Sequence, residues 1–379
     1  MKFTITRATF IKSLNDVSRA ITSKTTIPIL TNLKMDLTDN ALVLTGSDAD
    51  ISIESKIDAT SEQNDLQIED PGSITVPARF FTEIVKRLPE KTMTVDVQDN
   101  YQTVITSGKS EFKINGLDAN NYPRLPEVSG EDALTVPADV LRQLIAQTVI
   151  AVSTQESRPI LTGVHIQIEK GKLIAVATDS HRLAQRTLDL PSAGDASYDV
   201  IIPGKSLTEL GRTLTDDIDN VEIRFASNQV LFIAGNTLFY SRLLEGNYPD
   251  TSRLIPTTST TTIEFDAPTL LSAIGRASLL SHESSNNVVR LDLNTAKQTA
   301  TIYGNSPDVG NVEEALQFQK LEGDDLEISF NPDYMKDALQ GVGATSIVLA
   351  FTAPLRPFTL VPTEDKEHFV QLITPVRTF

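Results

Sequence analysis

The chain has 379 residues, 40% hydrophobic and 22% charged, with a net charge of −17; this composition is typical of a folded globular protein and excludes a disordered one. It contains no cysteine, so disulfide bonds, thiolate metal sites and a cysteine nucleophile are excluded together. At about 150 residues per domain, the length predicts two or three domains. The acidic balance argues against general attraction to nucleic acid.

The first elements are short and regular. Residues 1–10, "MKFTITRATF", alternate apolar and polar side chains, which is typical of a β-strand and not of a signal peptide. No segment approaches the ~18 consecutive apolar residues of a membrane span, so we expect a soluble cytoplasmic protein. A helix is predicted over 8–20, followed by "IPILTNLKMDL" from Ile27. A second strand and helix, "SITVPARFFTEIVKRL", begin at residue 73 with Pro at their junction.

This order of elements returns twice. "RPILTGVHIQI" repeats the earlier phrase, and Pro28 and Pro159 are 131 residues apart. We predict an α+β fold of three tandem domains, each made of two β-α-β-β-β units, with about two dozen strands in all. The domains are predicted over 1–127, 128–258 and 259–379, with linkers at 128–132 and 256–262. The six helices are predicted over residues 8–20, 78–88, 138–150, 204–214, 267–280 and 332–340.

The predicted helices are the basic part of this acidic chain. Three of them share one spacing, in which an acid follows a base by four residues and a second base follows three later, as in Lys12-Asp16-Arg19. Seven residues return to within ~20° of the same helix face, so the two bases lie ~10 Å apart along the axis. Such a face is either a solvated surface with local ion pairs or a positive surface for phosphates. The recurrence favours the second reading, with duplex nucleic acid held nonspecifically.

The motifs of catalytic chemistry are weak. "GKS" at 108–110 and 204–206 lacks the glycine that a P-loop needs five residues earlier, where Thr103 and Asp199 stand. "TDSHRLA" at 178–184 holds Asp, Ser and His in succession, whereas triad residues converge from separate segments. The four histidines, at 165, 181, 282 and 368, lack metal-ligand spacing. None of these motifs supports an enzyme, and a hydrolase with paired carboxylates stays open without support from the sequence.

Several motifs together carry a resemblance. "IPILTN", "TVPAR", "ATDSHRLA", "NYPD" and a Pro-x-Arg near the end are similar to motifs of the bacterial DNA polymerase III beta subunit, the replicative sliding clamp family, over the full length. The resemblance implies two subunits joined head to tail in a ring of six clamp domains, with helices lining the hole and sheets outside. It implies a processivity factor that encircles double-stranded DNA without sequence specificity, slides on it and uses no cofactor, metal or catalytic residue. Implied partners are the replicative polymerase catalytic subunit, the clamp loader, and repair and translesion polymerases that carry clamp-binding peptides.

The resemblance also implies site residues. A hydrophobic cleft between the second and third domains would bind partner peptides with Leu or Phe anchors and an acid. Its residues would be Leu161, Thr178, His181, Arg182, Leu183, Pro249, Arg253, Leu254, Leu355, Leu372, Ile373, Pro375, Val376 and Arg377. DNA would be met by the helix bases together with Lys24 and Gln155, giving the set Lys12, Arg19, Lys24, Arg79, Lys86, Arg142, Gln155, Lys205, Arg212 and Arg276. The subunit seam would use Phe112 and Ile114 on one edge, Leu279 and Leu280 on the other, and Glu313 and Glu314 facing bases such as Lys109.

Three departures from the family pattern bear on the cleft. Ser180 stands where the family commonly has Gly, Arg356-Pro357 replaces smaller polar residues, and Thr378-Phe379 follows Arg377 where members often end on Arg-Leu. Two other functions remain as alternatives: a β-rich hydrolase or sugar-binding protein, weakened by the lack of tryptophan, and an interaction scaffold that keeps the peptide cleft without encircling DNA.

Overall fold

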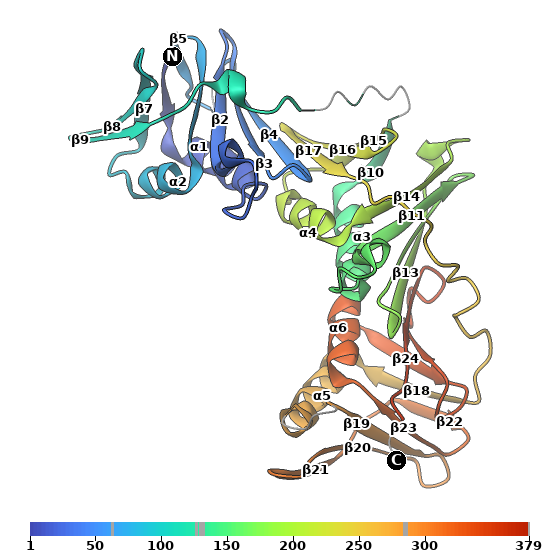
Figure 1. The fold of residues 1–379 in the computed structure, drawn as a ribbon. Coiled ribbons are helices and arrows are strands. Elements are labelled where there is room, and N and C mark those ends of the chain that lie inside the picture. The colour runs from blue at the N-terminus through green and yellow to red at the C-terminus, as the bar shows by residue number, and fades with distance from the viewer. Residues whose placement is uncertain (62–63, 126–127, 129–132, 283–286, 378–379) are drawn as a thin grey trace. The chain divides into compact units, whose positions relative to one another are not determined.

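The computed structural model describes residues 1–61, 64–125, 128, 133–282 and 287–377 (Figure 1). The chain divides into two compact units. Unit 1 comprises Met1–Leu141 and Glu209–Leu243, and unit 2 comprises Arg142–Thr208 and Leu244–Phe379. Within the described residues, no helix is long and apolar enough to cross a membrane.

All six predicted helices are present, each within two residues of its predicted ends. Their starts have local causes. Pro77 immediately precedes α2, while Pro268 and Pro332 occupy the first turns of α5 and α6, where a missing N–H costs nothing. Side chains of Asp266 and Asn331 cap α5 and α6 by accepting backbone N–H bonds. The helices are α1 (Arg7–Ser18), α2 (Ala78–Arg87), α3 (Ala138–Thr148), α4 (Gly204–Thr213), α5 (Ala267–Ser281) and α6 (Pro332–Val342).

Unit 1 contains two antiparallel sheets. The first has the order β5-β1-β7-β8-β9 and the second the order β10-β15-β16-β17-β4-β3-β2-β6. Helices α1 and α2 contact each other (Figure 1), and their buried rings meet those of the first sheet: Phe10 lies 6.3 Å from Phe3 and 5.7 Å from Phe81 between centroids. The strands are β1 (Lys2–Thr6), β5 (Gln67–Asp70), β7 (Thr92–Val97), β8 (Gln102–Ser107), β9 (Ser110–Asn115), β10 (Leu134–Pro137), β15 (Asn220–Phe225), β16 (Gln229–Ala234), β17 (Thr237–Arg242), β4 (Ile51–Asp58), β3 (Ala41–Ser47), β2 (Asn32–Leu37) and β6 (Gly72–Pro77).

Unit 2 is built in the same way. Its nine-stranded sheet has the order β14-β11-β12-β13-β26-β25-β24-β18-β22 and its four-stranded sheet the order β21-β20-β19-β23. Helices α5 and α6 contact each other, and Phe358 joins the core with Phe330 and Phe351 at 5.6 and 5.0 Å. The strands are β11 (Gly163–Glu169), β12 (Lys172–Thr178), β13 (Arg182–Asp189), β14 (Tyr198–Pro203), β18 (Thr261–Asp266), β19 (Val289–Asn294), β20 (Thr299–Ser306), β21 (Gly310–Ala315), β22 (Lys320–Gly323), β23 (Leu326–Phe330), β24 (Ser346–Phe351), β25 (Phe358–Pro362) and β26 (Phe369–Ile373).

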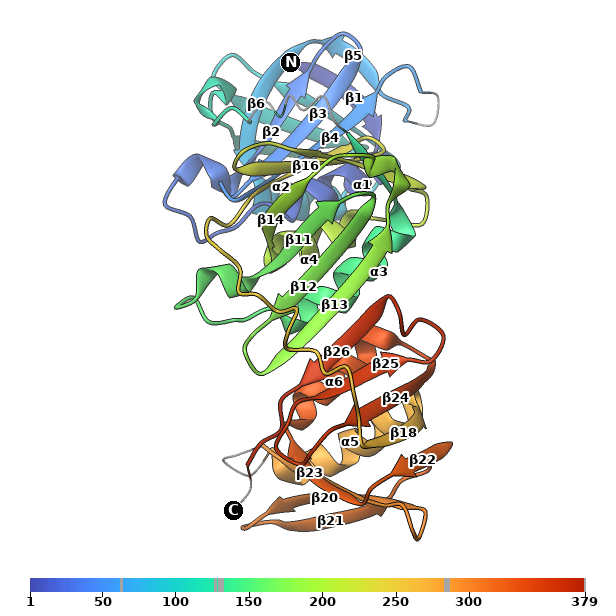
Figure 2. The ribbon, with the colours of Figure 1, turned by 90° about the vertical axis from the view of Figure 1, so that its right-hand side faces the viewer.

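Two strand pairs join copies of the repeat. In unit 1, β17 of the second copy pairs with β4 of the first, from Thr237 opposite Ser55 to Ser241 opposite Ile51. In unit 2, β13 of the second copy pairs with β26 of the third, from Arg182 opposite Ile373 to Arg186 opposite Phe369. Figure 2 lets β11, β12 and β13 and then β26, β25 and β24 be followed across unit 2. Backbone hydrogen bonds therefore connect the copies, because each pairing gives two edge strands a partner.

The two predicted linkers had different outcomes. Most of 128–132 lies outside the described residues. The prediction for 256–262 is wrong at its end, because β18 begins at Thr261 and pairs with β24 there. Threonine is β-branched and suits a strand, so a run rich in threonine does not separate linker from strand. The domain boundaries themselves stay predictions.

Candidate partner and nucleic-acid interfaces

The turn between β12 and β13 is held by its own side chains. Asp179 accepts the backbone N–H groups of His181 and Arg182 at 2.9 and 3.0 Å, and it also accepts the Arg182 Nε at 3.0 Å. Thr178 donates its hydroxyl to the Arg182 carbonyl at 2.6 Å. Ser180 has φ +80°, the left-handed region that glycine prefers. The turn therefore adopts the glycine-type backbone although a serine occupies the position, and its side chain accepts a bond from Arg158 Nη1 at 3.1 Å.

Arg182 connects this turn to α6. Its Nη1 donates to Asp337 Oδ2 at 2.5 Å, and its guanidinium lies 4.6 Å from the centroid of the Tyr334 ring. His181 stacks on the same ring at 6.3 Å. The Arg182 side chain is only 16% exposed, so its charge is held by two carboxylates and an aromatic face.

Next to the turn, β13 and β26 bring several predicted cleft residues together. Leu183 lies opposite Leu372, and both belong to a small buried apolar cluster with Val176 against which Ile255 packs. The N–H of Thr374 donates to the His181 carbonyl at 2.9 Å. The segment after β26 thus continues alongside the turn.

The segment after β17 reaches the same place. Tyr248 accepts the backbone N–H of Thr178 at 3.0 Å, and its ring stacks on His165 at 4.8 Å between centroids. Burial raises the pKa of Tyr248 to about 12, so its hydroxyl is neutral at ordinary pH. Pro249 follows directly and is exposed, as are Arg253 and Leu254 further on.

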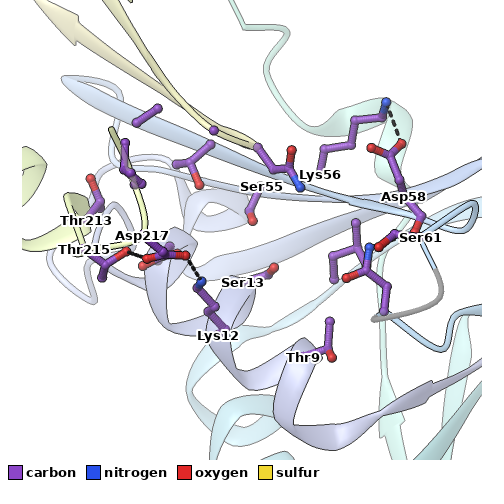
Figure 3. Close-up of a pocket in the computed structure, with 18 residues that line it drawn as sticks. Thr9, Lys12, Ser13, Ser55, Lys56, Asp58, Ser61, Thr213, Thr215 and Asp217 are labelled. Atoms are coloured by element: carbon purple, nitrogen blue, oxygen red, sulfur yellow. Dashed lines mark hydrogen bonds and ion pairs between the residues drawn. The ribbon is translucent and has the colours of Figure 1, made fainter. Parts of the chain in front are cut away.

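Two bases at α1, Lys12 and Arg19, have carboxylate partners in the next copy of the repeat. Lys12 Nζ of α1 lies 2.7 Å from Asp217 Oδ2, beyond α4, in a polar hollow of about 350 Å³ (Figure 3). Hydrogen bonds from Lys12 and Thr215 lower the pKa of Asp217 to about 2. Arg19 and Arg212 share Glu209, at 3.6 and 2.7 Å.

Three other predicted bases, among the described residues, are exposed and outside any ion pair. Among the described residues, Lys24, Arg79 and Lys86 form no ion pair, and all three are exposed. Gln155 and Lys205 are also exposed, and Arg142 is half-buried. The basic helix face is therefore heterogeneous, with part of its charge already neutralised.

Each unit has an open sheet edge at the residues predicted for the subunit seam. Strand β9 is the last strand of the five-stranded sheet, with Phe112 38% exposed and Ile114 half-buried. Lys109, at the turn before it, is exposed. Strand β21 is the last strand of the four-stranded sheet and carries Glu313 and Glu314.

The edge at β21 has an apolar and an ionic part. Leu279 on α5 is 69% exposed and Leu280 is half-buried. Arg276 donates Nε to Glu314 at 2.9 Å, and this bond lowers the pKa of Glu314. Arg276, predicted to face DNA, and Glu314, predicted to face bases of another subunit, therefore hold each other within this chain.

Comparison with known proteins matches the whole chain. Models of the DNA polymerase III beta subunit match residues 1–126 with its N-terminal domain, 135–250 with its central domain and 252–377 with its C-terminal domain. The chain belongs to the DNA polymerase III beta subunit family.

Relatives and solved structures agree with this assignment. The chain is 51% identical to the beta sliding clamp of Bacillus subtilis (strain 168) and 46% identical to that of Staphylococcus aureus (strain Mu50 / ATCC 700699), with all of each chain covered. A crystal structure of the DNA polymerase sliding clamp from Bacillus subtilis superposes with a TM-score of 0.95 at 50% identity, and a DNA polymerase III beta chain from Streptococcus pneumoniae with 0.95 at 45%, again over all of each chain. The predicted fold of three tandem clamp domains is confirmed, and the function is that of a DNA polymerase processivity factor.

Within this family fold, some predicted cleft residues have direct contacts with one another and others do not. Thr178, His181, Arg182, Leu183 and the β26 residues Leu372 and Ile373 form one connected group. Leu161 is buried in the 3-10 turn before β11, and Leu355 is 57% exposed on the loop before β25. Thr378 and Phe379 lie outside the described residues.

Sequence reasoning missed three residues of this group. Asp179 holds the turn, Tyr248 accepts the Thr178 N–H, and Tyr334 stacks on His181. Tyr248 stands inside the "NYPD" motif, so its signal was available. Tyr334 and its neighbour Asp337 are on a helix more than 150 residues from the turn, and nothing local to either segment indicates the contact.

Proposed function

We propose that two copies of this chain close head to tail into a ring around duplex DNA and tether the replicative polymerase to it. The chain would act without catalysis and in the cytoplasm, as three clamp domains over 1–127, 128–258 and 259–379. The family assignment over the full length carries this proposal, and three features of the chain support its parts.

The first feature is the partly neutralised basic helix face. Duplex DNA needs phosphate contacts that give affinity without reading sequence, and a ring that slides needs each contact to be weak. Lys24, Arg79 and Lys86 have no carboxylate partner in the part of the chain that the structure describes. We therefore expect them to contribute more to DNA contact than Lys12 and Arg19, which have one.

The second feature is the group around the β12–β13 turn. Exposed His181, Arg253 and Leu254 lie on segments that meet over buried Leu183 and Leu372. Apolar residues with nearby bases suit a short peptide that offers Leu or Phe side chains and a carboxylate. Polymerases and the clamp loader would bind here in turn.

The third feature is the pair of open sheet edges. Edge strands pair readily with another chain, and here each edge has an exposed apolar residue, Phe112 at β9 and Leu279 beside β21. Two different surfaces on one chain make a heterologous contact, which generates a ring when the rotation closes. Lys109 and Glu313 give the two edges opposite charge.

The ring is tested on nicked circular DNA. The protein is loaded with a clamp loader and ATP, the circle is cut, and protein retained on DNA is measured. We expect rapid loss after cutting, because a ring slides off free ends; retention equal to that on the intact circle would reject encirclement. The matched variant is Phe112→Ala, which we expect to lower both the dimer fraction by light scattering and the amount loaded.

The DNA face is tested by charge-reversal variants that all change the net charge of the chain by the same amount. Arg79→Glu and Lys86→Glu should slow loading and reduce the salt dependence of DNA binding by a log–log slope of about 0.9 for each lost phosphate contact. Lys170→Glu, on the β11–β12 turn, makes the same charge change and should leave loading unaltered. Equal effects from all three variants would reject the assignment of this helix face.

A further inference from the structure

A second set of polar residues lies behind the β12–β13 turn on strands that carry none of the predicted cleft residues. It begins at Asp199 on β14, the edge strand of the nine-stranded sheet. Asp199 Oδ1 lies 2.7 Å from His165 Nε2, and Asp199 Oδ2 accepts Gln167 Nε2 at 3.0 Å. Burial alone would raise the pKa of Asp199, but the bonds from Gln167 and His165 outweigh it and hold the pKa below its ordinary value.

These bonds fix the orientation of the His165 imidazole. An ionised carboxylate only accepts hydrogen bonds, so Nε2 of His165 carries the proton that it donates to Asp199. The imidazole is 11% exposed and lies almost parallel to the Tyr248 ring, with 4.8 Å between centroids and 23° between planes. Aromatic rings at this separation attract each other beyond the area they bury.

Tyr248 then connects the imidazole to the turn. Its hydroxyl accepts the backbone N–H of Thr178 at 3.0 Å, and the Thr178 hydroxyl binds the Arg182 carbonyl, which closes the turn. Tyr248 also immediately precedes Pro249 in the segment that leads to Arg253 and Leu254. One ring therefore sets the position of two segments that meet over the apolar cluster of Val176, Leu183 and Leu372.

We propose that His165 is a positioning residue for partner-peptide binding: oriented by Asp199, it holds Tyr248 so that the 178–182 turn and the 249–254 segment keep a binding geometry. His165 itself touches no peptide in this scheme. The inference rests on the proposed peptide site and names the residues that preorganise it. Preorganisation matters because ordering a loop at the moment of binding subtracts from affinity.

The variants separate the two interactions of the imidazole. His165→Leu removes both the stacking and the bond to Asp199, whereas His165→Phe keeps the stacking alone. Tyr248→Phe keeps the stacking but removes the acceptor of the Thr178 N–H. His368→Leu is the matched control, because His368 also binds an aspartate, Asp365, yet lies before β26, away from Tyr248.

Binding is measured by fluorescence anisotropy with a labelled six-residue synthetic peptide that contains one Leu, one Phe and one Asp. We expect His165→Leu and Tyr248→Phe each to weaken binding about threefold to tenfold, the effect of losing one net hydrogen bond. The double variant should bind no more weakly than the worse single variant, because both changes interrupt one chain of contacts. His165→Phe should recover most of the affinity, and His368→Leu should bind like the parent protein.

Hydrogen exchange of the Thr178 amide is the second readout. It should speed up in His165→Leu and Tyr248→Phe and stay slow in His165→Phe, while exchange elsewhere in β11 and β12 stays unaltered. Parent-like binding by His165→Leu, or effects that multiply in the double variant, would overturn the positioning role. If the parent protein fails to bind the peptide, the peptide site is rejected, and unchanged Thr178 exchange in His165→Leu would then reject the positioning role as well. Should His165→Leu not fold, His165→Gln, which removes the ring but keeps an amide donor for Asp199, takes its place. Weaker binding and faster Thr178 exchange are then expected of His165→Gln, and parent-like values for both would overturn the positioning role.

Discussion

We expect Arg182→Ala to destabilise unit 2 far more than Asp337→Asn, which removes only the more exposed of the two Arg182 ion pairs. In Arg182→Ala, the Asp179 carboxylate, 13% exposed, loses the charged donor Arg182, which costs about 2–3 kcal/mol. Loss of the cation–π contact with Tyr334 adds about 0.5–1 kcal/mol. The pair with Asp337, which is 41% exposed, adds at most about 1 kcal/mol. We take about 3 kcal/mol as the sum, because contacts of one side chain do not add fully.

Calorimetry of the full chain tests this value. A destabilisation of this size shifts the transition of a unit of about 200 residues by roughly 6–12 °C. Asp337→Asn, which loses only the exposed pair, should shift it by less than about 4 °C. A shift below 2 °C for Arg182→Ala, or an equal shift for Asp337→Asn, would refute the view that the turn is stabilised mainly by the ion pair of Arg182 with the largely buried Asp179 carboxylate.

Three further changes test other local features. Lys12→Met should raise the pKa of Asp217 from about 2 toward 3.8. In the parent protein this pair stabilises the fold above pH 3.8, and the stabilisation is lost as the pH falls through about 2; the variant should lack it. A carboxyl NMR titration in which the Asp217 midpoint is the same in the variant as in the parent would contradict the pairing. Ser180→Gly removes the backbone strain of a residue with a Cβ at φ +80°, whereas Ser180→Ala keeps it. In thermal melts the glycine variant should therefore be more stable than the alanine variant by about 1 kcal/mol. Gly46→Ala should destabilise unit 1 by about 1–3 kcal/mol, because a Cβ there would lie 2.3 Å from the Val17 carbonyl oxygen; a melting temperature like the parent's would show that α1 moves aside freely.

The helices could be predicted closely because their signals are local. Apolar residues such as Phe10, Leu14 and Val17 recur at helical spacing and are all buried. Prolines and capping residues mark the starts, and each lies within a few positions of the helix it begins. The repeated phrase added a second constraint, because each copy had to fold alike.

The strand pairs and ion pairs that connect the copies could not be predicted from local sequence signals. Pairing of β17 with β4 joins residues more than 180 positions apart, and alternation along a strand shows only which face is buried and not which strand lies beside it. Lys12 and Asp217 are 205 positions apart in sequence, and Arg182 and Asp337 are 155 positions apart. The base-acid-base spacing on the helices was visible, but which of those bases meets a carboxylate from elsewhere depends on tertiary structure.

Neighbouring copies of the repeat are joined twice: by the chain itself, and by the strand pairs β4–β17 and β13–β26. Peptide tethers keep the repeats on one polypeptide, while ladders of main-chain hydrogen bonds join their neighbouring edge strands. Lengthening the tether at 256–260 with glycine and serine should therefore leave these strand pairs intact. Cutting the chain into its repeats would instead separate β4 from β17 and β13 from β26, and each of these strands would become an exposed sheet edge. The repeats are therefore separate in sequence but not independent as folded units.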